Sequence, residues 1–352
     1  MLIITNEQFG YHTDTYKYAE KMNKEYNIYF LCLDYNYTKI KMNNISFIYV
    51  RKSNNNKINN IKLLLYAIIS ILKYRIDIVF TMYFRLCNII PIIFKNRKHN
   101  LDIRTGIISE NIEIVKKGNK NIARACKSFK NISIISEGLI DYLKIEKRNK
   151  NIRILPLGAD IDSTIRNKKN KDSITFGYIG VLNDRNINDT LKSFIKFSNE
   201  LDSGEFLIVG YHSKNNSEKE EFYQLIKSND RIKFLGRVQH NKINEILSRI
   251  DVGISYVPKK DYYNFQPPTK TYEYLAYGIP CIATSTNENK KIISSFNGIL
   301  CEDNIEDLFE KMKYINLNIN KYNSEIIKKS IRNNSWEYIC NNIFKDIIEN
   351  LK

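Results

Sequence analysis

The sequence indicates its fold class most clearly at residues 266–284, QPPTKTYEYLAYGIPCIAT. This stretch predicts a helix over 269–277, because Pro268 fits the start of a helix and Gly278 suits its end. After Gly278 the chain turns directly into a continuous apolar strand. A helix that leads straight into a buried strand is the repeating unit of an α/β sheet.

Outward from this unit, short apolar runs alternate with longer amphipathic stretches along the chain. The runs are continuous, which is typical of parallel strands covered on both faces. The sequence therefore predicts two doubly wound, Rossmann-like α/β domains. The expected strands are 2–5, 28–33, 45–49, 76–81, 101–103, 132–135, 153–155, 174–179, 206–209, 232–235, 252–256, 281–284 and 299–301, with helices that include 15–24, 58–73 and 112–129.

The alternation breaks near Pro156, where Pro, Gly and a polar, charged run are typical of a linker between domains. Because ligands of doubly wound sheets bind at the carboxyl ends of the strands, we expect a site in a cleft between two facing domains. The expected parts are 1–155 on the acceptor side, a linker at 156–172, a donor domain at 173–332, and a C-terminal helix at 333–352. The apolar face of that helix would pack on the first domain, through Trp336, Ile339, Ile343, Ile347 and Leu351.

The chain is basic, with 55 Lys and Arg against 38 Asp and Glu. Residues 1–155 hold 27 basic and 12 acidic residues, and residues 156–352 hold 28 and 26. A basic protein attracts nucleic acid, membranes or anionic substrates. Nucleic-acid-binding proteins concentrate Arg and aromatic residues on one face, whereas this excess is Lys-rich and diffuse, which disfavours nucleic acid. We expect the first half to bind an anionic membrane surface through 58–75 and 87–98; a genome-wide Lys bias is the alternative.

The cysteine pattern and the N-terminus predict the compartment. The six cysteines form no CxxC pair, which predicts buried free thiols in a reducing cytoplasm. Residues 1–10 lack the basic and apolar regions of a signal peptide. The longest apolar stretch, 63–72, is about half of the ~20 residues that a membrane span needs. We therefore expect a cytoplasmic protein, peripheral at the inner face of the cytoplasmic membrane.

Two motifs in the second half suit an anionic ligand. Lys270 and Glu273 lie three residues apart on one helix face, so a phosphate and a ribose can bind side by side. The alternative is an exposed ion pair. GYIGVLNDR, at 177–185, joins a strand to a glycine loop and brings Arg185 before a helix. A similar loop at 7–12 follows the first strand, and its alternative is a plain turn.

Two further patterns have residue types that suit a functional site. Asp102 and Arg104 stand at the end of a strand, facing the expected cleft, and the alternative is a buried structural pair. The acidic pair at 160–162 has a metal-binding pattern, but its place in the linker disfavours a metal site.

The second half resembles the donor domain of the family 4 (group 1) retaining glycosyltransferases with GT-B architecture, of the cell-envelope polysaccharide type. The segments that carry this resemblance lie in the family's order between residues 153 and 303: LPLGAD, TFGYIGVLNDR, FLIVG, RIKFLGRVQHNKINEILSRIDVGISYVP, TKTYEYLAYGIPCIAT and NGILCED. In the first half, LDIRTG and the first glycine loop are similar to envelope-polysaccharide members.

The resemblance implies roles for individual residues. Glu273 would hold the donor ribose as the second Glu of an E-x7-E pattern, whose first position is Phe265 here, which leaves the donor sugar open. Arg185 and Lys270 would bind the diphosphate and stabilise the leaving group. The other implied residues are Gly10, Gly180, Gly236, Val238 and Thr271 for donor binding, with Gly236 and Val238 at the base and Gly10 reaching from the first domain, and Asp102 or Arg104 as catalytic residues in place of a family His.

The resemblance also implies a reaction. A hexosyl group would pass with retention from a UDP- or GDP-sugar, UDP being favoured, to a saccharide or lipid-linked saccharide in envelope polysaccharide synthesis. Fixed cations and helix amides can stabilise the departing diphosphate, so we expect no metal and no cofactor. The alternatives are a nucleotide-sugar 2-epimerase of the same fold, whose acid/base carboxylates we do not locate, and a basic nucleic-acid-binding protein.

Overall fold

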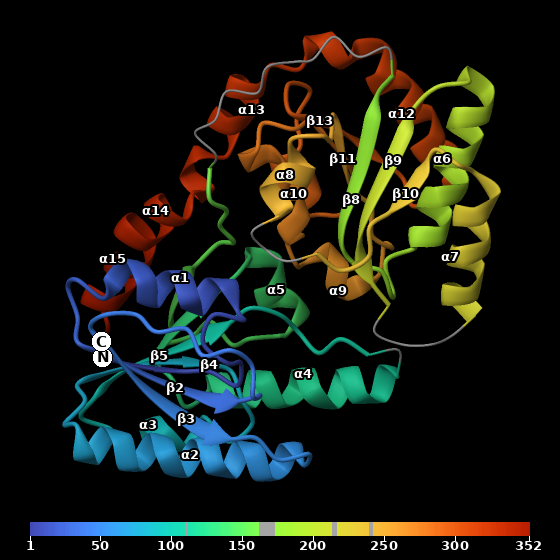
Figure 1. Ribbon diagram of the computed structural model, residues 1–352. Helices are drawn as coiled ribbons and strands as arrows, with labels where there is room; N and C mark the ends of the chain where they lie inside the picture. The colour runs from blue at the N-terminus through green and yellow to red at the C-terminus, as the bar shows by residue number, and fades with distance from the viewer. Residues whose placement is uncertain (110, 162–172, 213–216, 239–241) are drawn as a thin grey trace. The chain divides into compact units, whose positions relative to one another are not determined.

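The computed structural model describes residues 1–109, 111–161, 173–212, 217–238 and 242–352. These residues form two compact units, unit 1 (1–158 and 336–352) and unit 2 (159–335) (Figure 1). Most of the expected linker, residues 162–172, lies outside the described residues, and Asp162 of the acidic pair lies there too.

Unit 1 is built on a seven-stranded parallel sheet of order β3-β2-β1-β4-β5-β6-β7. At its centre Ile3 pairs with Phe30 on one side and Phe80 on the other. The three residues of β1 are fully buried, as a strand covered on both faces must be. The strands are β1 (Leu2–Ile4), β2 (Ile28–Asp34), β3 (Ile45–Arg51), β4 (Ile78–Met82), β5 (Lys98–Ile103), β6 (Asn131–Ile134) and β7 (Asn151–Ile154).

The helices of unit 1 begin where side chains cap their first amides. Asn111 accepts hydrogen bonds from two backbone N–H groups of α4, and Asn55, His12 and Ser136 each cap one helix in the same way. These caps satisfy amides that otherwise lack intrahelical partners. The helices are α1 (Thr13–Met22), α2 (Asn56–Lys73), α3 (Ile89–Ile93), α4 (Ile112–Cys126) and α5 (Glu137–Tyr142).

The C-terminal segment packs in the core of unit 1. It consists of α14 (Trp336–Tyr338), a π-helix (Ile339–Phe344) and α15 (Lys345–Glu349). Phe344 stacks on Tyr18 with ring centroids 4.5 Å apart, whereas Ile343 is only partly buried. The residues of the predicted apolar face all pack in or against this core, Ile343 being partly buried, and Phe344 of the wider π-helical turn joins them.

Unit 2 is built on a six-stranded parallel sheet of order β10-β9-β8-β11-β12-β13. Its strands are β8 (Thr175–Val181), β9 (Glu205–Tyr211), β10 (Ile232–Phe234), β11 (Val252–Ser255), β12 (Cys281–Thr284) and β13 (Gly298–Cys301). Its helices are α6 (Ile187–Leu201), α7 (Ser217–Ser228), α8 (Ile243–Leu247), α9 (Asp261–Asn264), α10 (Thr269–Ala276), α11 (Asn289–Ile292), α12 (Ile305–Asn318) and α13 (Ser324–Ser330), with 3-10 turns at Ile319–Lys321 and Arg332–Asn334.

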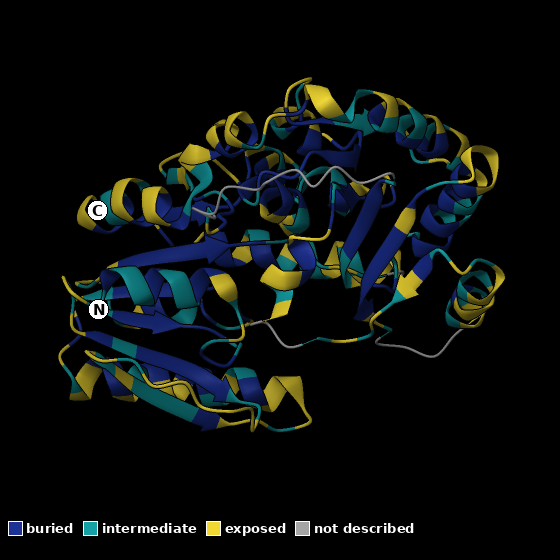
Figure 2. Cartoon of the chain, turned by 45° about the horizontal axis from the view of Figure 1, so that its top comes forward, coloured by how far each residue is buried: buried dark blue, intermediate teal, exposed yellow. Residues whose placement is uncertain are grey.

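Both sheets confirm the predicted doubly wound α/β class. Most of their strands are buried, while the exposed residues gather on helices and loops (Figure 2). The six cysteines are buried and free, as predicted. Within the described ranges, every helix is too short or too polar to cross a membrane.

Candidate functional site

The predicted donor residues of unit 2 meet where β8 ends. Gly180 has a φ of +148°, a backbone conformation that glycine adopts far more readily than other residues. A Cβ added there would lie 3.8 Å from Cε and 3.9 Å from Nζ of Lys270. The strand end and the first turn of α10 therefore approach each other closely, and Lys270 lies beside the glycine loop.

The ammonium group of Lys270 is buried without a hydrogen-bond partner. It stands over the ring of Tyr178, with Nζ 3.7 Å from the ring centroid. Burial, together with the like charge of Arg185, lowers the pKa of Lys270 well below its usual value. The exposed Lys270–Glu273 ion pair of the alternative interpretation does not form. A buried amine of this kind is poised to accept an anion, which would restore its charge and its hydrogen bonds.

Arg185 supplies the second cation of the site. Its guanidinium carbon lies 4.4 Å from the centroid of the Tyr263 ring. Tyr263 in turn donates a hydrogen bond to the carbonyl of Asp184 at 2.9 Å, which fixes the turn before α6. Asn186, the N-cap of α6, makes no side-chain cap. This turn therefore presents a cation beside the positive end of a helix dipole.

Buried hydroxyl groups of α10 determine where Lys270 stands. Thr271 Oγ1 lies 2.7 Å from Ser255 Oγ and donates to Asn289 Oδ1 at 3.1 Å. Tyr274 Oη accepts a hydrogen bond from the amide of Ile179 at 2.9 Å, which ties α10 to β8. Thr271 is fully buried, so its hydroxyl helps to position α10, and its part in donor binding stays a prediction.

The remaining predicted residues of unit 2 lie on neighbouring elements. Glu273 is exposed on α10, and its charge opposes the lowering of the Lys270 pKa. Gly236 follows β10 with a φ of +66°, and its carbonyl accepts the Gly210 amide at 3.0 Å. A Cβ added to Gly236 would meet nothing within 4 Å, so this loop is open beside the half-exposed Val238.

The local structure of unit 1 explains why residue 10 is a glycine. Its φ is +87°, and an added Cβ would lie 2.3 Å from Cδ1 of Ile40. The positive φ favours glycine at this turn, and an added Cβ would in addition force the Ile40 side chain to move. The part of Gly10 in donor binding stays a prediction.

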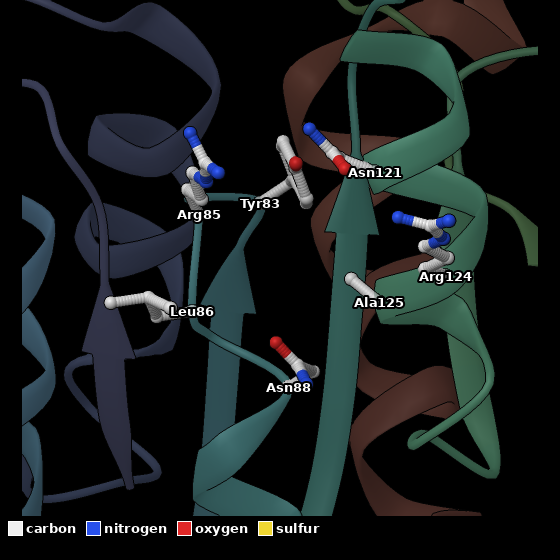
Figure 3. A pocket seen from close by; sticks show the side chains of 7 residues that line it. All are labelled: Tyr83, Arg85, Leu86, Asn88, Asn121, Arg124 and Ala125. Carbon is white, nitrogen blue, oxygen red and sulfur yellow. The ribbon is translucent and has the colours of Figure 1, made fainter. Parts of the chain in front are cut away.

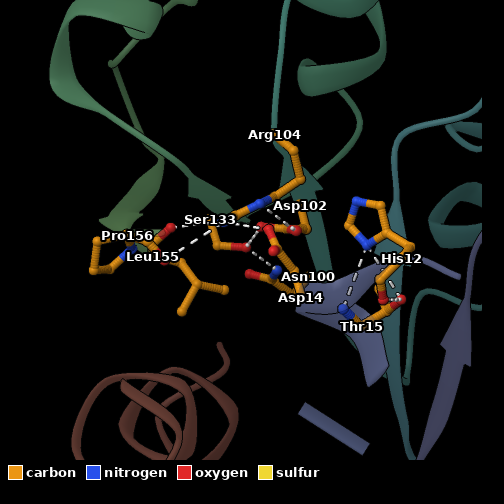
Figure 4. A network of polar contacts seen from close by, with 9 residues as sticks. All are labelled: His12, Asp14, Thr15, Asn100, Asp102, Arg104, Ser133, Leu155 and Pro156. Carbon is orange, nitrogen blue, oxygen red and sulfur yellow. Dashed lines mark hydrogen bonds and ion pairs between the residues drawn. The ribbon is translucent and has the colours of Figure 1, made fainter. Parts of the chain in front are cut away.

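Asp102 and Arg104 belong to a buried polar network (Figure 4). Arg104 Nη2 lies 2.5 Å from Asp14 Oδ2, and Nη1 donates to the carbonyl of Leu155 at 2.6 Å. Asp102 Oδ1 accepts a hydrogen bond from Ser133 Oγ at 2.6 Å. Burial raises the pKa of Asp102 to about 6, although the charge of Arg104 opposes the rise. The structure thus favours the alternative of a structural pair, and we propose no catalytic role for either residue.

The aromatic residues around the two cations were missed in the sequence. Tyr178 lies under Lys270, Tyr263 lies against Arg185, and Tyr274 anchors α10. Their only signal was that Tyr274 follows Lys270 by one helical turn. Among the described residues, no group of three or more His, Cys, Asp or Glu side chains is placed to hold a metal ion.

Comparisons with known proteins identify the class of unit 2. Residues 173–316 of the chain match the family model of the group 1 glycosyl transferases. The match covers the β8 loop, Arg185, α10 and Glu273. The resemblance to the group 1 glycosyltransferases is therefore confirmed, and with it the coarse function of glycosyl transfer. No curated protein sequence matches the chain.

Solved structures show that the whole chain has the GT-B fold. Sucrose-phosphate synthase from Thermosynechococcus elongatus is similar with a TM-score of 0.75 at 13% identity, over 98% of this chain and 97% of that one. Anabaena HepE in complex with UDP is similar with a TM-score of 0.75 at 11% identity, over 98% of each chain. A glycosyltransferase from Rickettsia africae ESF-5 is similar with a TM-score of 0.72 at 17% identity, over 99% of this chain and 98% of that one. The predicted GT-B architecture is confirmed.

Proposed function

We propose that this chain transfers a hexosyl group, with retention and without a metal, from a nucleotide-diphosphate sugar to a saccharide or lipid-linked saccharide. The observation that carries the proposal is the buried amine of Lys270, which stands at the end of β8 without a hydrogen-bond partner. Anabaena HepE has been solved with UDP and with UDP and glucose, which supports UDP over GDP as the nucleotide.

Different residues of unit 2 bind the diphosphate, the ribose and the base of the donor. Lys270 and Arg185 bind the diphosphate, and the amides of the Gly180 loop and of α6 add hydrogen bonds. Glu273, one turn after Lys270, accepts hydrogen bonds from the ribose hydroxyls. The open loop at Gly236 and Val238 takes the base.

The proposed chemistry needs these cations in the transition state. The bond between the anomeric carbon and the diphosphate oxygen breaks, and the acceptor oxygen bonds to the same face of that carbon. The acceptor proton passes to an oxygen of the leaving phosphate, so the step requires no carboxylate nucleophile. Charge builds up on the diphosphate as the bond breaks, and Lys270 and Arg185 stabilise it there.

Turnover with a panel of UDP- and GDP-sugars, with and without EDTA, tests this proposal. We expect UDP release with one UDP-sugar, unchanged by EDTA, and a product of retained anomeric configuration. Lys270→Ala and Arg185→Ala should each lower kcat by roughly 10²–10³-fold, the usual loss when one stabilising donor is removed. Lys227→Ala, an exposed lysine of α7, is the matched control. Abolition of activity by EDTA would contradict the metal-free mechanism, and product analysis distinguishes transfer from 2-epimerisation.

We also propose that unit 1 binds the inner face of the cytoplasmic membrane. Along α2, large exposed apolar side chains recur every three or four residues. The exposed fraction of the side chain is 56% at Ile69 and 64% at Leu72. Exposed lysines lie on the same helix at Lys57 and Lys73. An apolar stripe with basic neighbours suits the boundary between lipid headgroups and acyl chains. The other members of this stripe, which we call the α2 stripe, are Ile58, Ile61 and Leu65.

A further inference from the structure

Unit 1 contains a small pocket whose lining includes none of the predicted site residues. Its lining comes from two places, the loop that follows β4 and the last two turns of α4 (Figure 3). In Figure 3, Tyr83 and Arg85 stand on the side of the loop, and Asn121 and Arg124 stand on the side of α4. The pocket is lined by Tyr83, Arg85, Leu86, Asn88, Asn121, Arg124 and Ala125.

The pocket is cationic and its donors are available. Within the described part of the chain, neither Arg85 nor Arg124 has a side-chain hydrogen bond or an ion pair. By contrast, Arg97 and Arg104 of the same unit are paired with aspartates. No acidic side chain lines the pocket. Two guanidinium groups without carboxylates in one pocket select an anion, because Arg presents several N–H donors to an oxyanion.

The loop that carries Arg85 is held in a strained conformation. Leu86 has a φ of +83°, which is rare for a residue with a branched side chain. The buried neighbours Phe84 and Cys87 anchor the loop, and the Cys87 amide donates to the Phe84 carbonyl at 3.1 Å. The packing on either side therefore maintains the strain, and the loop keeps Arg85 and Asn88 at the pocket.

The pocket's size and lining limit what it can hold. Its volume of about 190 Å³ lies below the roughly 300–1,000 Å³ of sites that enclose a whole drug-sized ligand. It therefore fits one unit of a larger molecule. Asn88 and Asn121 can donate to and accept from hydroxyl groups, and burial raises the pKa of Tyr83 to about 12, so its phenol is a neutral donor.

From this lining we infer that the pocket binds an acidic sugar unit of the acceptor, with its phosphate or carboxylate on Arg85 and Arg124 and its hydroxyls on the two asparagines. The inference rests on the proposed transfer to a saccharide, and it names the acceptor as anionic. The residues that line the pocket all belong to unit 1 and include none of the predicted donor residues, which belong to unit 2 apart from Gly10. The shared chemistry is an oxyanion beside sugar hydroxyls, whether it comes from a uronate or from a sugar phosphate.

Binding of glucuronate, glucose 6-phosphate and glucose to the full chain tests the inference. The titrations are made with saturating UDP present, so that the diphosphate site is occupied. We expect both acidic sugars to bind at least tenfold more tightly than glucose, and Arg85→Gln with Arg124→Gln to remove this preference. Arg148→Gln, an exposed arginine of unit 1 outside the pocket, should keep it. The unfolding midpoint of each variant shows whether the fold is intact.

Each outcome decides one proposal. A preference for glucuronate alone would assign a uronate, and a preference for glucose 6-phosphate alone would assign a sugar phosphate. Equal binding of glucose, or acidic-sugar binding unchanged in the folded double variant, would overturn the pocket's role while UDP binding keeps the glycosyltransferase proposal. Absence of UDP binding, with acidic-sugar binding lost in the double variant, would instead overturn the proposed donor and retain the pocket.

Discussion

Lys270 Nζ lies 3.7 Å from the centroid of the Tyr178 ring and has no hydrogen-bond partner. The ring face attracts a cation, but it does not replace the water that burial removes from an ammonium group. The pKa of Lys270 is consequently well below its usual value. A group of this kind gains most when a phosphate arrives, because the ligand returns both the charge and the hydrogen bonds.

Binding of UDP should be coupled to proton uptake. The free protein holds the pKa of Lys270 low, and a bound diphosphate raises it. At pH values between the free and bound pKa, each binding event therefore takes up a proton, and affinity falls as pH rises. Calorimetry in two buffers of different ionisation enthalpy measures the uptake. We expect Lys270→Ala to abolish it and to weaken UDP binding about tenfold or more, with Lys227→Ala unchanged; equal heats in both buffers for the unmodified protein would refute the coupling.

Gly180→Ala should weaken UDP binding. The added Cβ has room beside Lys270, but the φ of +148° would cost roughly 1–3 kcal/mol. The loop is expected to relax away from Lys270 and to misplace the amides that face the diphosphate. Gly204→Ala is the control, since Gly204 has a φ of +93° at the start of β9, outside the donor residues. Both variants should lower the melting temperature, and only Gly180→Ala should raise the Kd for UDP; a matching Kd change in both would indicate a general loss of stability.

Glu273→Ala should raise the donor KM while changing kcat little. Hydrogen bonds from ribose to this carboxylate would form in the ground state and the transition state alike, so their loss reduces uniform binding. A loss of roughly 1.5 kcal/mol corresponds to about a tenfold rise in KM. Initial rates against UDP-sugar concentration measure it, with the exposed Glu220→Ala as control. An unchanged KM would remove the ribose role.

Asp102→Asn should change how stability depends on pH. Burial raises the pKa of Asp102 to about 6 in the folded state from an ordinary value of 3.8. The folded state therefore binds the proton more tightly than the unfolded state, and this residue's contribution to stability falls as pH rises from about 4 to about 6. The shift of about two pKa units corresponds to roughly 3 kcal/mol.

Urea unfolding of both proteins between pH 4 and pH 7 measures this contribution. The free energy of unfolding of Asp102→Asn relative to the unmodified protein should rise across that range, whatever its absolute value. Two parallel pH profiles would show that Asp102 does not titrate in the folded protein.

Removing apolar side chains from the α2 stripe should weaken membrane binding. Ile69→Ser with Leu72→Ser loses exposed apolar surface without disturbing the buried face of α2. We expect co-sedimentation with phosphatidylglycerol vesicles to fall roughly tenfold, and salt to weaken binding of the unmodified protein. Leu317→Ser, 81% exposed on α12 of unit 2, is the control. Equal binding of the unmodified protein to neutral phosphatidylcholine vesicles would show that the basic residues do not contribute to membrane binding. The excess of lysine would then be a bias of composition.

Local patterns in the sequence were sufficient for most of the fold. Continuous apolar runs predicted every strand to within a few residues, and Gly278 marked the end of α10 with a φ of +72°. The run criterion missed the first half of β5, where His99 and Asn100 are polar yet buried. Asn100 Nδ2 donates a hydrogen bond to Ser133 Oγ of β6 at 2.7 Å, a partner that only the sheet order supplies.

The sequence by itself determined the two α/β sheets, the motif residues around Lys270 and the uneven distribution of charge. Only the tertiary structure decided what each motif residue does. It buried Lys270 over Tyr178, turned Thr271 into a support for α10, and enclosed Asp102 with Arg104. The physical reason is how far apart in the sequence the interacting residues lie. Helix ends, turns and strand runs depend on neighbours in sequence, whereas burial and charge pairing depend on which distant strands and helices pack together.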